Sequence, residues 1–175
     1  AAGGPTIMLN LDDATRLVPG TGPLLMVSPV GEPDLLIWKL TPNGNTAWAK
    51  KLGDEAYQGI DEGGLLGLDY NSANRLVVGS SLQGSVDFGE GLVVSSAGET
   101  DALLATLDED GNALWAKGIG GPGPFQAFFS INADPSNDDI VGTVLSAAEI
   151  DFGDGQAYVP VSEVGIDAFV VKYQR

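Results

Sequence analysis

The sequence repeats itself at a nearly fixed spacing. Residues 34–50, DLLIWKLTPNGNTAWAK, return as residues 101–117, DALLATLDEDGNALWAK, displaced by 67 positions. A third copy opens at Asp167 with DAFVVKY, 66 residues after Asp101. A unit that recurs at a fixed period is a supersecondary module that buries its faces against neighbouring copies. The repeat therefore constrains the architecture of this chain before any local propensity is considered.

Short strands and tight turns fill each unit. Apolar alternation predicts strands at residues 6–11, 35–40, 46–52, 65–70, 75–82, 127–133, 140–145 and 168–173. The turn sequences PNGN at 42–45 and DGN at 110–112 favour hairpins, because Asn, Asp and Gly tolerate positive φ. A long loop is expected between the two hairpins of a unit, with VDFGEG at 86–91 and IDFGDG at 150–155. One unit thus holds four strands, two hairpins and one long loop.

Four antiparallel strands per unit are typical of a β-propeller blade. The offset of 67 divides the 175 residues into about 2.6 units, since 175/67 is 2.6. We predict an all-β, β-propeller-like array of four-stranded antiparallel blades. It would comprise a partial first blade at 1–62, a complete middle blade at 63–117 and a third blade at 118–175 that lacks its last strand. Because propellers close with about 4–8 blades, three arrangements are open: a fragment of a longer chain, several copies that complete a ring, or an open array with exposed edges.

Composition excludes several classes of function. The chain has 24 acidic and 8 basic residues, a net charge of −16, which repels phosphate backbones and anionic membrane surfaces. It has no Cys and no His, so disulfides, thiolate nucleophiles, Ser-His-Asp triads and the usual zinc sites are absent. No apolar run is long enough to span a bilayer. We therefore expect neither a nucleic-acid partner nor membrane insertion.

Tryptophans occupy two kinds of position. Trp48 and Trp115 lie 67 residues apart in identical Trp-Ala-Lys frames, which favours packing between adjacent blades over a role in stacking on sugars. Trp38 has no repeat equivalent, since position 105 is Ala. We therefore take Trp38 as the candidate for binding a partner or ligand.

Two tripeptides and three aspartates also recur. Asp87-Phe88-Gly89 returns as Asp151-Phe152-Gly153. The same three letters bind magnesium in kinases, but no kinase sequence context surrounds them here. We interpret them as turns in which Asp caps backbone N–H groups, Phe fills the blade and Gly takes positive φ. The aspartates that open each copy are interpreted as structural positions as well: Asp34, Asp101 and Asp167.

Two acidic turns have the composition of calcium loops. Asp108 and Asp110 lie in DEDGN, and Asp134 and Asp138 lie in DPSNDD. Clustered carboxylates suit a hard cation such as Ca²⁺. The EF-hand pattern fails, because Ile119 stands where its bidentate Glu would be. Turn chemistry is the favoured interpretation, with calcium as the alternative cofactor, and a melting temperature that ignores added calcium and EGTA would remove that alternative.

Residues 87–91, DFGEG, and 101–117, with Asp-Ala at the start and DGNALWAK at the end, resemble the SBBP-type bacterial β-propeller repeats. The resemblance covers residues 22–173. It implies a propeller fold in a large secreted or surface protein. It implies no activity, because a catalytic site does not define the family.

These observations favour a non-enzymatic structural or interaction module of an exported bacterial protein, extracellular or on the outer cell surface. A β-propeller scaffold of this kind would bind protein or glycan, or assemble with other subunits. The expected partners are other protein chains or the remaining blades of the same propeller, with glycans as a further ligand class. The alternative is a propeller glycoside hydrolase or lyase with paired carboxylates, which requires two acids that converge in one pocket.

Overall fold

The computed structural model describes residues 4–11, 15–17, 19–20, 25–58, 67–161 and 165–174. The regular elements in these residues are β-strands, and paired strands run antiparallel. The all-β prediction is therefore confirmed. No helix in the described part of the chain is long and apolar enough to cross a membrane.

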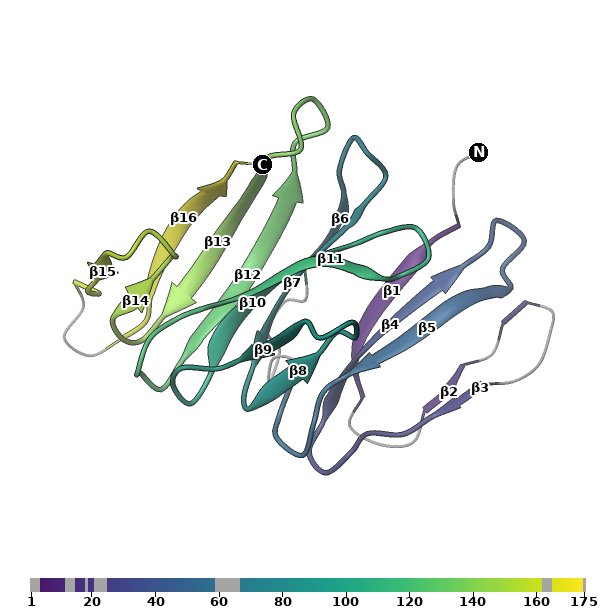
Figure 1. Cartoon of the computed structure of the whole chain (residues 1–175), viewed down its shortest axis with the longest axis horizontal. Helices are drawn as coiled ribbons and strands as arrows, with labels where there is room; N and C mark the ends of the chain where they lie inside the picture. The colour runs from purple at the N-terminus through teal and green to yellow at the C-terminus, as the bar shows by residue number, and fades with distance from the viewer. Residues whose placement is uncertain are drawn as a thin grey trace.

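Three main sheets carry the fold and lie in a row, with the second between the other two (Figure 1). Sheet I has the strand order β1 (Thr6–Leu11), β4 (Asp34–Leu40), β5 (Thr46–Leu52). Sheet II has the order β11 (Ala113–Ile119), β10 (Asp101–Leu107), β7 (Leu76–Leu82), β6 (Gly67–Tyr70). Sheet III has the order β12 (Gln126–Ala133), β13 (Ile140–Ser146), β16 (Asp167–Tyr173).

The three main sheets share one pairing scheme. The aspartate that opens each repeat starts β4, β10 or β16, and it faces Leu11, Leu82 or Ser146 on the preceding strand. β1, β7 and β13 are therefore equivalent strands of the three sheets. β4, β10 and β16, which pair with them, are equivalent to one another as well. β5 and β11 follow at the outer edge, with the same register shift next to Leu40 and Leu107. Equivalent residues can therefore be compared from sheet to sheet.

The predicted hairpin turns are confirmed. β4 and β5 meet at a turn in which Gly44 has a φ of 79°, and Gly111 has a φ of 81° between β10 and β11. The Asp108 N–H donates to the Asn112 carbonyl at 2.9 Å and closes the second turn. Glycine at these two positions follows from the left-handed backbone that the tight turn requires.

The long loop predicted in each unit is instead a small two-stranded hairpin. These hairpins are β2 (Thr15–Leu17) with β3 (Leu25–Val27), β8 (Ser85–Asp87) with β9 (Val93–Ser95), and β14 (Ile150–Asp151) with β15 (Ala157–Tyr158). Each strand has at most three residues, too few for alternation to stand out in the sequence. Val86 and Val94 bury one face of the second hairpin in the core, which stabilises it.

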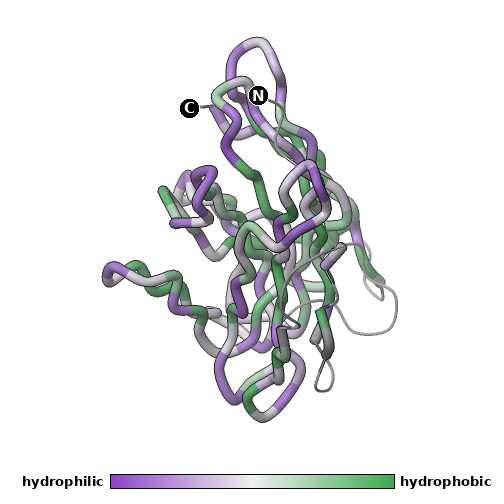
Figure 2. Tube along the Cα trace, turned by 90° about the vertical axis from the view of Figure 1, so that its right-hand side faces the viewer, coloured by the Kyte–Doolittle hydropathy of each residue, from purple (hydrophilic) through white to green (hydrophobic). Residues whose placement is uncertain are grey.

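Sheet II is covered on both faces. Its core with sheet I includes Leu35, Ile37, Leu52, Leu76, Val78 and Leu103. Its core with sheet III includes Ala102, Leu104, Ile119, Phe128, Ile131 and Val144. Every residue of β7 and β10 is consequently buried, and Figure 2 shows apolar residues along the strands and hydrophilic ones at the turns. In the described residues the sheets form an open row, and a closed ring is not seen.

Candidate functional site

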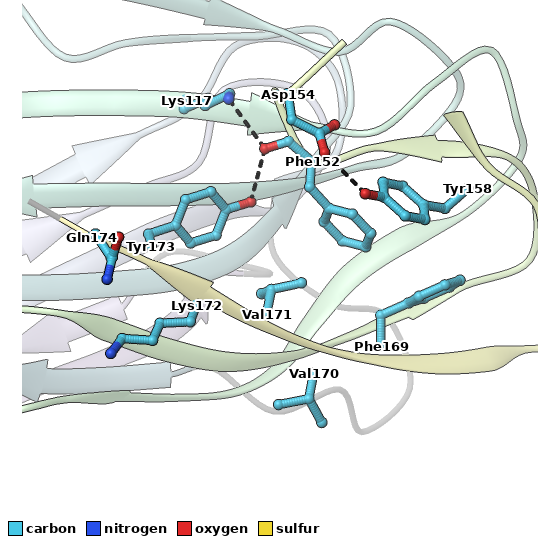
Figure 3. Close-up of a pocket in the computed structure, with 11 residues that line it drawn as sticks. Lys117, Phe152, Asp154, Tyr158, Phe169, Val170, Val171, Lys172, Tyr173 and Gln174 are labelled. Carbon is cyan, nitrogen blue, oxygen red and sulfur yellow. Dashed lines mark hydrogen bonds between the residues drawn. The ribbon is translucent and has the colours of Figure 1, made fainter. Parts of the chain in front are cut away.

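A pocket of about 670 Å³ lies beside the edge of sheet III (Figure 3). It is formed by β16, by the hairpin of β14 and β15, and by one side chain of β11. The lining residues that matter for its chemistry are Lys117, Phe152, Asp154, Tyr158, Phe169 and Tyr173. The pocket is therefore assembled from three separate segments of the chain.

Three aromatic rings form one wall of this pocket. The Phe152 ring centroid lies 5.5 Å from that of Tyr158 and 5.4 Å from that of Phe169. A tight turn positions Phe152, because the Asp151 carboxylate accepts the Gly153 N–H at 2.6 Å and Gly153 has a φ of 99°. Such tilted and edge-on ring contacts stabilise the packing of the three rings.

Hydrogen bonds fix the polar groups of the pocket (Figure 3). Lys117 Nζ and the Tyr173 hydroxyl both donate to the Phe152 carbonyl, each at 3.2 Å. The Tyr158 hydroxyl donates to Asp154 Oδ2 at 2.9 Å. These side chains hold the hairpin against sheet III.

The two phenols of the pocket have raised pKa values. Hydrogen bonds from the Gln156 N–H and the Tyr158 hydroxyl lower the pKa of the Asp154 carboxyl. The charged Asp154 in turn raises the pKa of Tyr158. Burial, together with nearby Asp151 and Asp154, raises the pKa of Tyr173. Both tyrosines are therefore neutral hydrogen-bond donors at physiological pH, and both hydroxyls donate within the protein.

The three aspartates that open the repeats share one contact. Asp34, Asp101 and Asp167 accept the backbone N–H groups of Val30, Ala97 and Val161 at 2.8, 2.8 and 2.5 Å. Asp34 and Asp101 are buried, and Asp34 also pairs with Lys51 at 3.2 Å. These contacts anchor the loop that enters each strand, which is a structural role.

Two buried glutamines at the junctions between sheets were missed by the sequence reasoning. Gln58 and Gln126 are fully buried. The backbone N–H of Gln58 donates to the Pro33 carbonyl and that of Gln126 to the Thr100 carbonyl, each at 2.8 Å. With the Gln126 side-chain amide turned to the orientation that satisfies both of its ends, its nitrogen donates to Asp101 Oδ1 at 3.2 Å. An available signal was the aromatic-Gln pair, which occurs as YQ at 57–58 and FQ at 125–126.

The tryptophans lie at contacts between sheets or on a sheet face. Trp48 Nε1 donates to the Glu109 carbonyl at 2.8 Å, so it joins sheet I to the turn between β10 and β11 of sheet II. Trp115 packs against the core between sheets II and III. Trp38 donates to Thr46 Oγ1 at 3.0 Å and packs, partly buried, against the cluster that contains Leu36. A partner-binding role for Trp38 stays a prediction.

The first Asp-Phe-Gly sequence forms a turn at the core between sheets I and II. The Gly89 N–H donates to Asp87 at 2.8 Å, and Gly89 has a φ of 89°. The Phe88 ring is buried in that core. Phe152, in the second copy, is only partly buried because it faces the pocket.

The four candidate calcium ligands lie on two different turns. Asp108 accepts the Asn112 N–H at 2.7 Å, and Asp134 accepts the Ser136 hydroxyl at 2.6 Å. Asp138 accepts the Ser72 hydroxyl at 2.5 Å and so links two neighbouring turns. Asp110 contributes its N–H to Asp108 at 3.0 Å. Within the described ranges no three acidic side chains gather as metal ligands, and calcium binding stays a prediction.

Asp54 links the segment after β5 to the hairpin of sheet II. Its carboxylate accepts the N–H groups of Ala56 at 2.8 Å and Ser85 at 2.9 Å, and the Gln58 amide at 2.8 Å. Burial raises the pKa of this carboxyl, but the hydrogen bonds outweigh burial and hold the pKa below its ordinary value. The folded state therefore prefers the charged form.

We expect the stability that Asp54 contributes to be lost in acid. Because the pKa is lowered by folding, this contribution is present above the ordinary carboxyl pKa of about 4 and disappears as the pH falls below it. Melting temperatures measured from about pH 6 to about pH 2.5 should fall less steeply for Asp54→Asn than for the wild-type chain. Glu55→Gln, at the exposed neighbouring position, is the control, and identical slopes for the two variants would contradict the assignment.

The described side chains thus include a pocket with an aromatic wall beside a strand edge. The repeated aspartates and the Asp87 turn are engaged in structural contacts. No family model matches the chain and no curated protein is significantly similar to it, so its function is inferred from this geometry.

Proposed function

We propose that this protein is a non-enzymatic interaction scaffold, a β-propeller-like array whose terminal sheets bind further protein. One observation carries the proposal. Val170 is 79% exposed and Val141 is 38% exposed on the outer face of sheet III. Their equivalents in sheet II, Leu104 and Val77, are fully buried against sheet III. Valines that are exposed in sheet III, at positions that are buried in sheet II where a neighbour covers them, are suited to contact another sheet.

The equivalence follows from the strand registers. Val170 faces Thr143 across the ladder of β16 and β13, as Leu104 faces Gly79 across that of β10 and β7. The same registers make Val141 the equivalent of Val77, because these residues face Lys172 and Thr106, which are themselves equivalent. The exposed valines therefore lie where sheet II has its contact with the next sheet.

A second copy of the chain offers the complementary face. Sheet I presents Leu9, Trp38 and Ala49 on the face turned away from sheet II, partly buried around Leu36. In sheet II the equivalent face, with Leu103 among its residues, receives sheet I. We therefore propose a head-to-tail contact between sheet III of one copy and sheet I of the next.

An exported location at the bacterial cell surface is part of the proposal. It is supported by the resemblance to SBBP-type repeats and by the net charge of −16, which favours solubility. Glycans are retained as a second ligand class on the strength of the aromatic wall of the pocket.

A hydrolase is the less favoured alternative. Glycoside hydrolysis requires two carboxylates about 5–10 Å apart across a cleft. Asp154 is the carboxylate in the lining of the pocket beside sheet III, and a second, smaller pocket of about 330 Å³ includes Asp108 and Glu109, which are adjacent on one turn. Asp154 already accepts the Gln156 N–H at 3.0 Å and the Tyr158 hydroxyl. These contacts favour a turn role for this acid.

We expect the chain to self-associate through the outer face of sheet III. Light scattering should give a mass of at least two 18.0 kDa chains. Val141→Lys should weaken association by about tenfold or more, because it places an unpaired charge in the contact. Leu114→Lys is the control, since Leu114 is similarly exposed on β11 of sheet II. A wild-type monomer at high concentration, or equal effects of the two variants, would contradict the proposal.

A further inference from the structure

One edge of β16 has no strand partner in the described part of the chain. β16 pairs with β13, and its other edge borders the pocket. The equivalent strands β4 and β10 carry β5 and β11 on that same edge. Unpaired backbone N–H and C=O groups on a strand edge form a template for a further strand.

The hairpin of sheet II shows where the additional strand would lie. β9 packs against β11, and a side chain at Gly118 would meet Val94 and the Ser95 carbonyl. β11 thus pairs with β10 along one edge, and the hairpin covers the face of β11 that is turned toward sheet I. In sheet III the pocket lies between β16 and the hairpin of β14 and β15 (Figure 3). The pocket therefore occupies the place that β11 fills in sheet II.

We propose that this edge binds an antiparallel strand with the sequence pattern shared by β5 and β11. That pattern is Trp-Ala-Lys, followed by one residue and then Leu or Ile. The partner is defined by this chemistry, and the inference rests on the proposed scaffold function. The strand enters between the edge of β16 and the aromatic wall formed by Phe152 and Tyr158.

The register follows from the two filled sheets. In sheet II, Trp115 faces Thr106 and Lys117 faces Leu104. The equivalents of Thr106 and Leu104 in β16 are Lys172 and Val170, so these two face the Trp and the Lys of the incoming strand. A Lys-Trp pair at this position already exists in sheet I, where Lys39 faces Trp48.

A small residue is expected opposite Phe169. Its equivalent in sheet II is Leu103, which faces Gly118. Phe169 is larger than Leu, and its ring contacts Phe152. A bulky side chain at this point of the incoming strand would have to displace the hairpin. The pocket thus favours the small residue that β11 carries after its Lys over the Lys51 that β5 carries at the same position.

The probe is a fluorescein-labelled peptide with residues 112–121, NALWAKGIGG, titrated with the full 175-residue chain and followed by anisotropy. Two further peptides carry N-methyl groups on alternate residues, one set at Trp115, Lys117 and Ile119 and the other at Leu114, Ala116 and Gly118. In an antiparallel ladder only one set of N–H groups faces β16. One methylated peptide should bind about tenfold more weakly or worse, while the other retains binding.

Charge exchange at Val170 tests the register. The side chain is 79% exposed, so substitution leaves the fold intact. Val170→Lys should weaken binding of the peptide about threefold, because like charges then face each other across the ladder, and Val170→Glu should strengthen it by a similar factor. A peptide with Lys117→Glu should reverse this order.

Equal loss with both methylated peptides, no reversal on charge exchange, or no binding of the parent peptide would each overturn the strand proposal. The N-methylated peptides leave the self-association face unchanged, so their outcome is separate from the scaffold proposal, whereas the Val170 variants alter both contacts. Self-association through Val141 can persist when the peptide does not bind, and then only the strand inference fails. If the chain neither self-associates nor binds the peptide, the scaffold proposal fails as well.

Discussion

Replacing Phe128 with alanine should lower the free energy of unfolding by about 3–5 kcal/mol, as expected for a large aromatic side chain deleted from a core. Phe128 is fully buried between sheets II and III. Two glycines make room for it: a Cβ added at Gly142 would lie 2.7 Å from the Phe128 ring, and one at Gly79 would lie 3.3 Å from Phe128 Cβ. Backbone this close cannot collapse easily into the vacated space. Equilibrium urea unfolding followed by circular dichroism measures the loss.

The adjacent residue supplies the control for this experiment. Phe129 has the same side chain but is 45% exposed, beside the register shift in the pairing of β12 with β13. Phe129→Ala should cost less than about 1 kcal/mol, because little packed surface is lost. Similar losses for the two variants would mean that sheet III does not pack on sheet II as described. Sheets in a row unfold in part independently. The loss of unfolding free energy in Phe128→Ala should therefore appear in the urea transition in which sheet III unfolds.

Most strands of the main sheets could be predicted from the sequence because the repeat supplied the same pattern more than once. The predicted bounds of β1 and β5, at 6–11 and 46–52, agree with the structure. The predicted strand at 65–70 is observed as β6 from Gly67, and residues 65–66 lie outside the described ranges. Asn-Gly and Asp-Gly turns fixed the hairpins because few other residues adopt their backbone angles.

The candidate site could not be predicted, because it depends on which strands become neighbours. Phe169 and Tyr158 are 11 residues apart in the sequence and belong to different sheets. Lys117 comes from sheet II. No local pattern relates these three residues. Phe152 was recognised as a repeated position, but only its surroundings show that it forms the pocket wall instead of filling a closed core.

The junctions between sheets escaped prediction for another reason. Polar residues between predicted strands usually indicate exposed turns, so the sequence gives no reason to expect Gln58 and Gln126 to be buried. Both are fully buried. Their neighbours explain this, since the link must turn from one sheet to the next and leaves backbone carbonyls that need donors. The aspartates at the start of β4 and β10 belong to the same polar junctions.

Replacing Asp101 with alanine should therefore be strongly destabilising, by about 3 kcal/mol, because buried donors would lose their acceptor. Asp101 is 2% exposed. Its Oδ2 accepts the Ala97 N–H at 2.8 Å, and its Oδ1 accepts the Gln126 side-chain N–H at 3.2 Å once that amide is turned to the orientation that satisfies both of its ends. Alanine would leave both donors without this partner at the junction of sheets II and III. The variant and the wild-type chain are compared by urea unfolding at neutral pH.

Asp167→Ala is the matched control, because Asp167 opens the third repeat at the same position. It is only partly buried, and one of its acceptor contacts is to the N–H of exposed Val161. Water can reach this carboxylate and its donor, so the expected loss is smaller than for Asp101, below about 1 kcal/mol. Asp101→Asn should fall between the two, since an amide keeps one acceptor oxygen for the two donors. If Asp101→Ala and Asp167→Ala cost the same, burial at the junction is not what makes this aspartate structural.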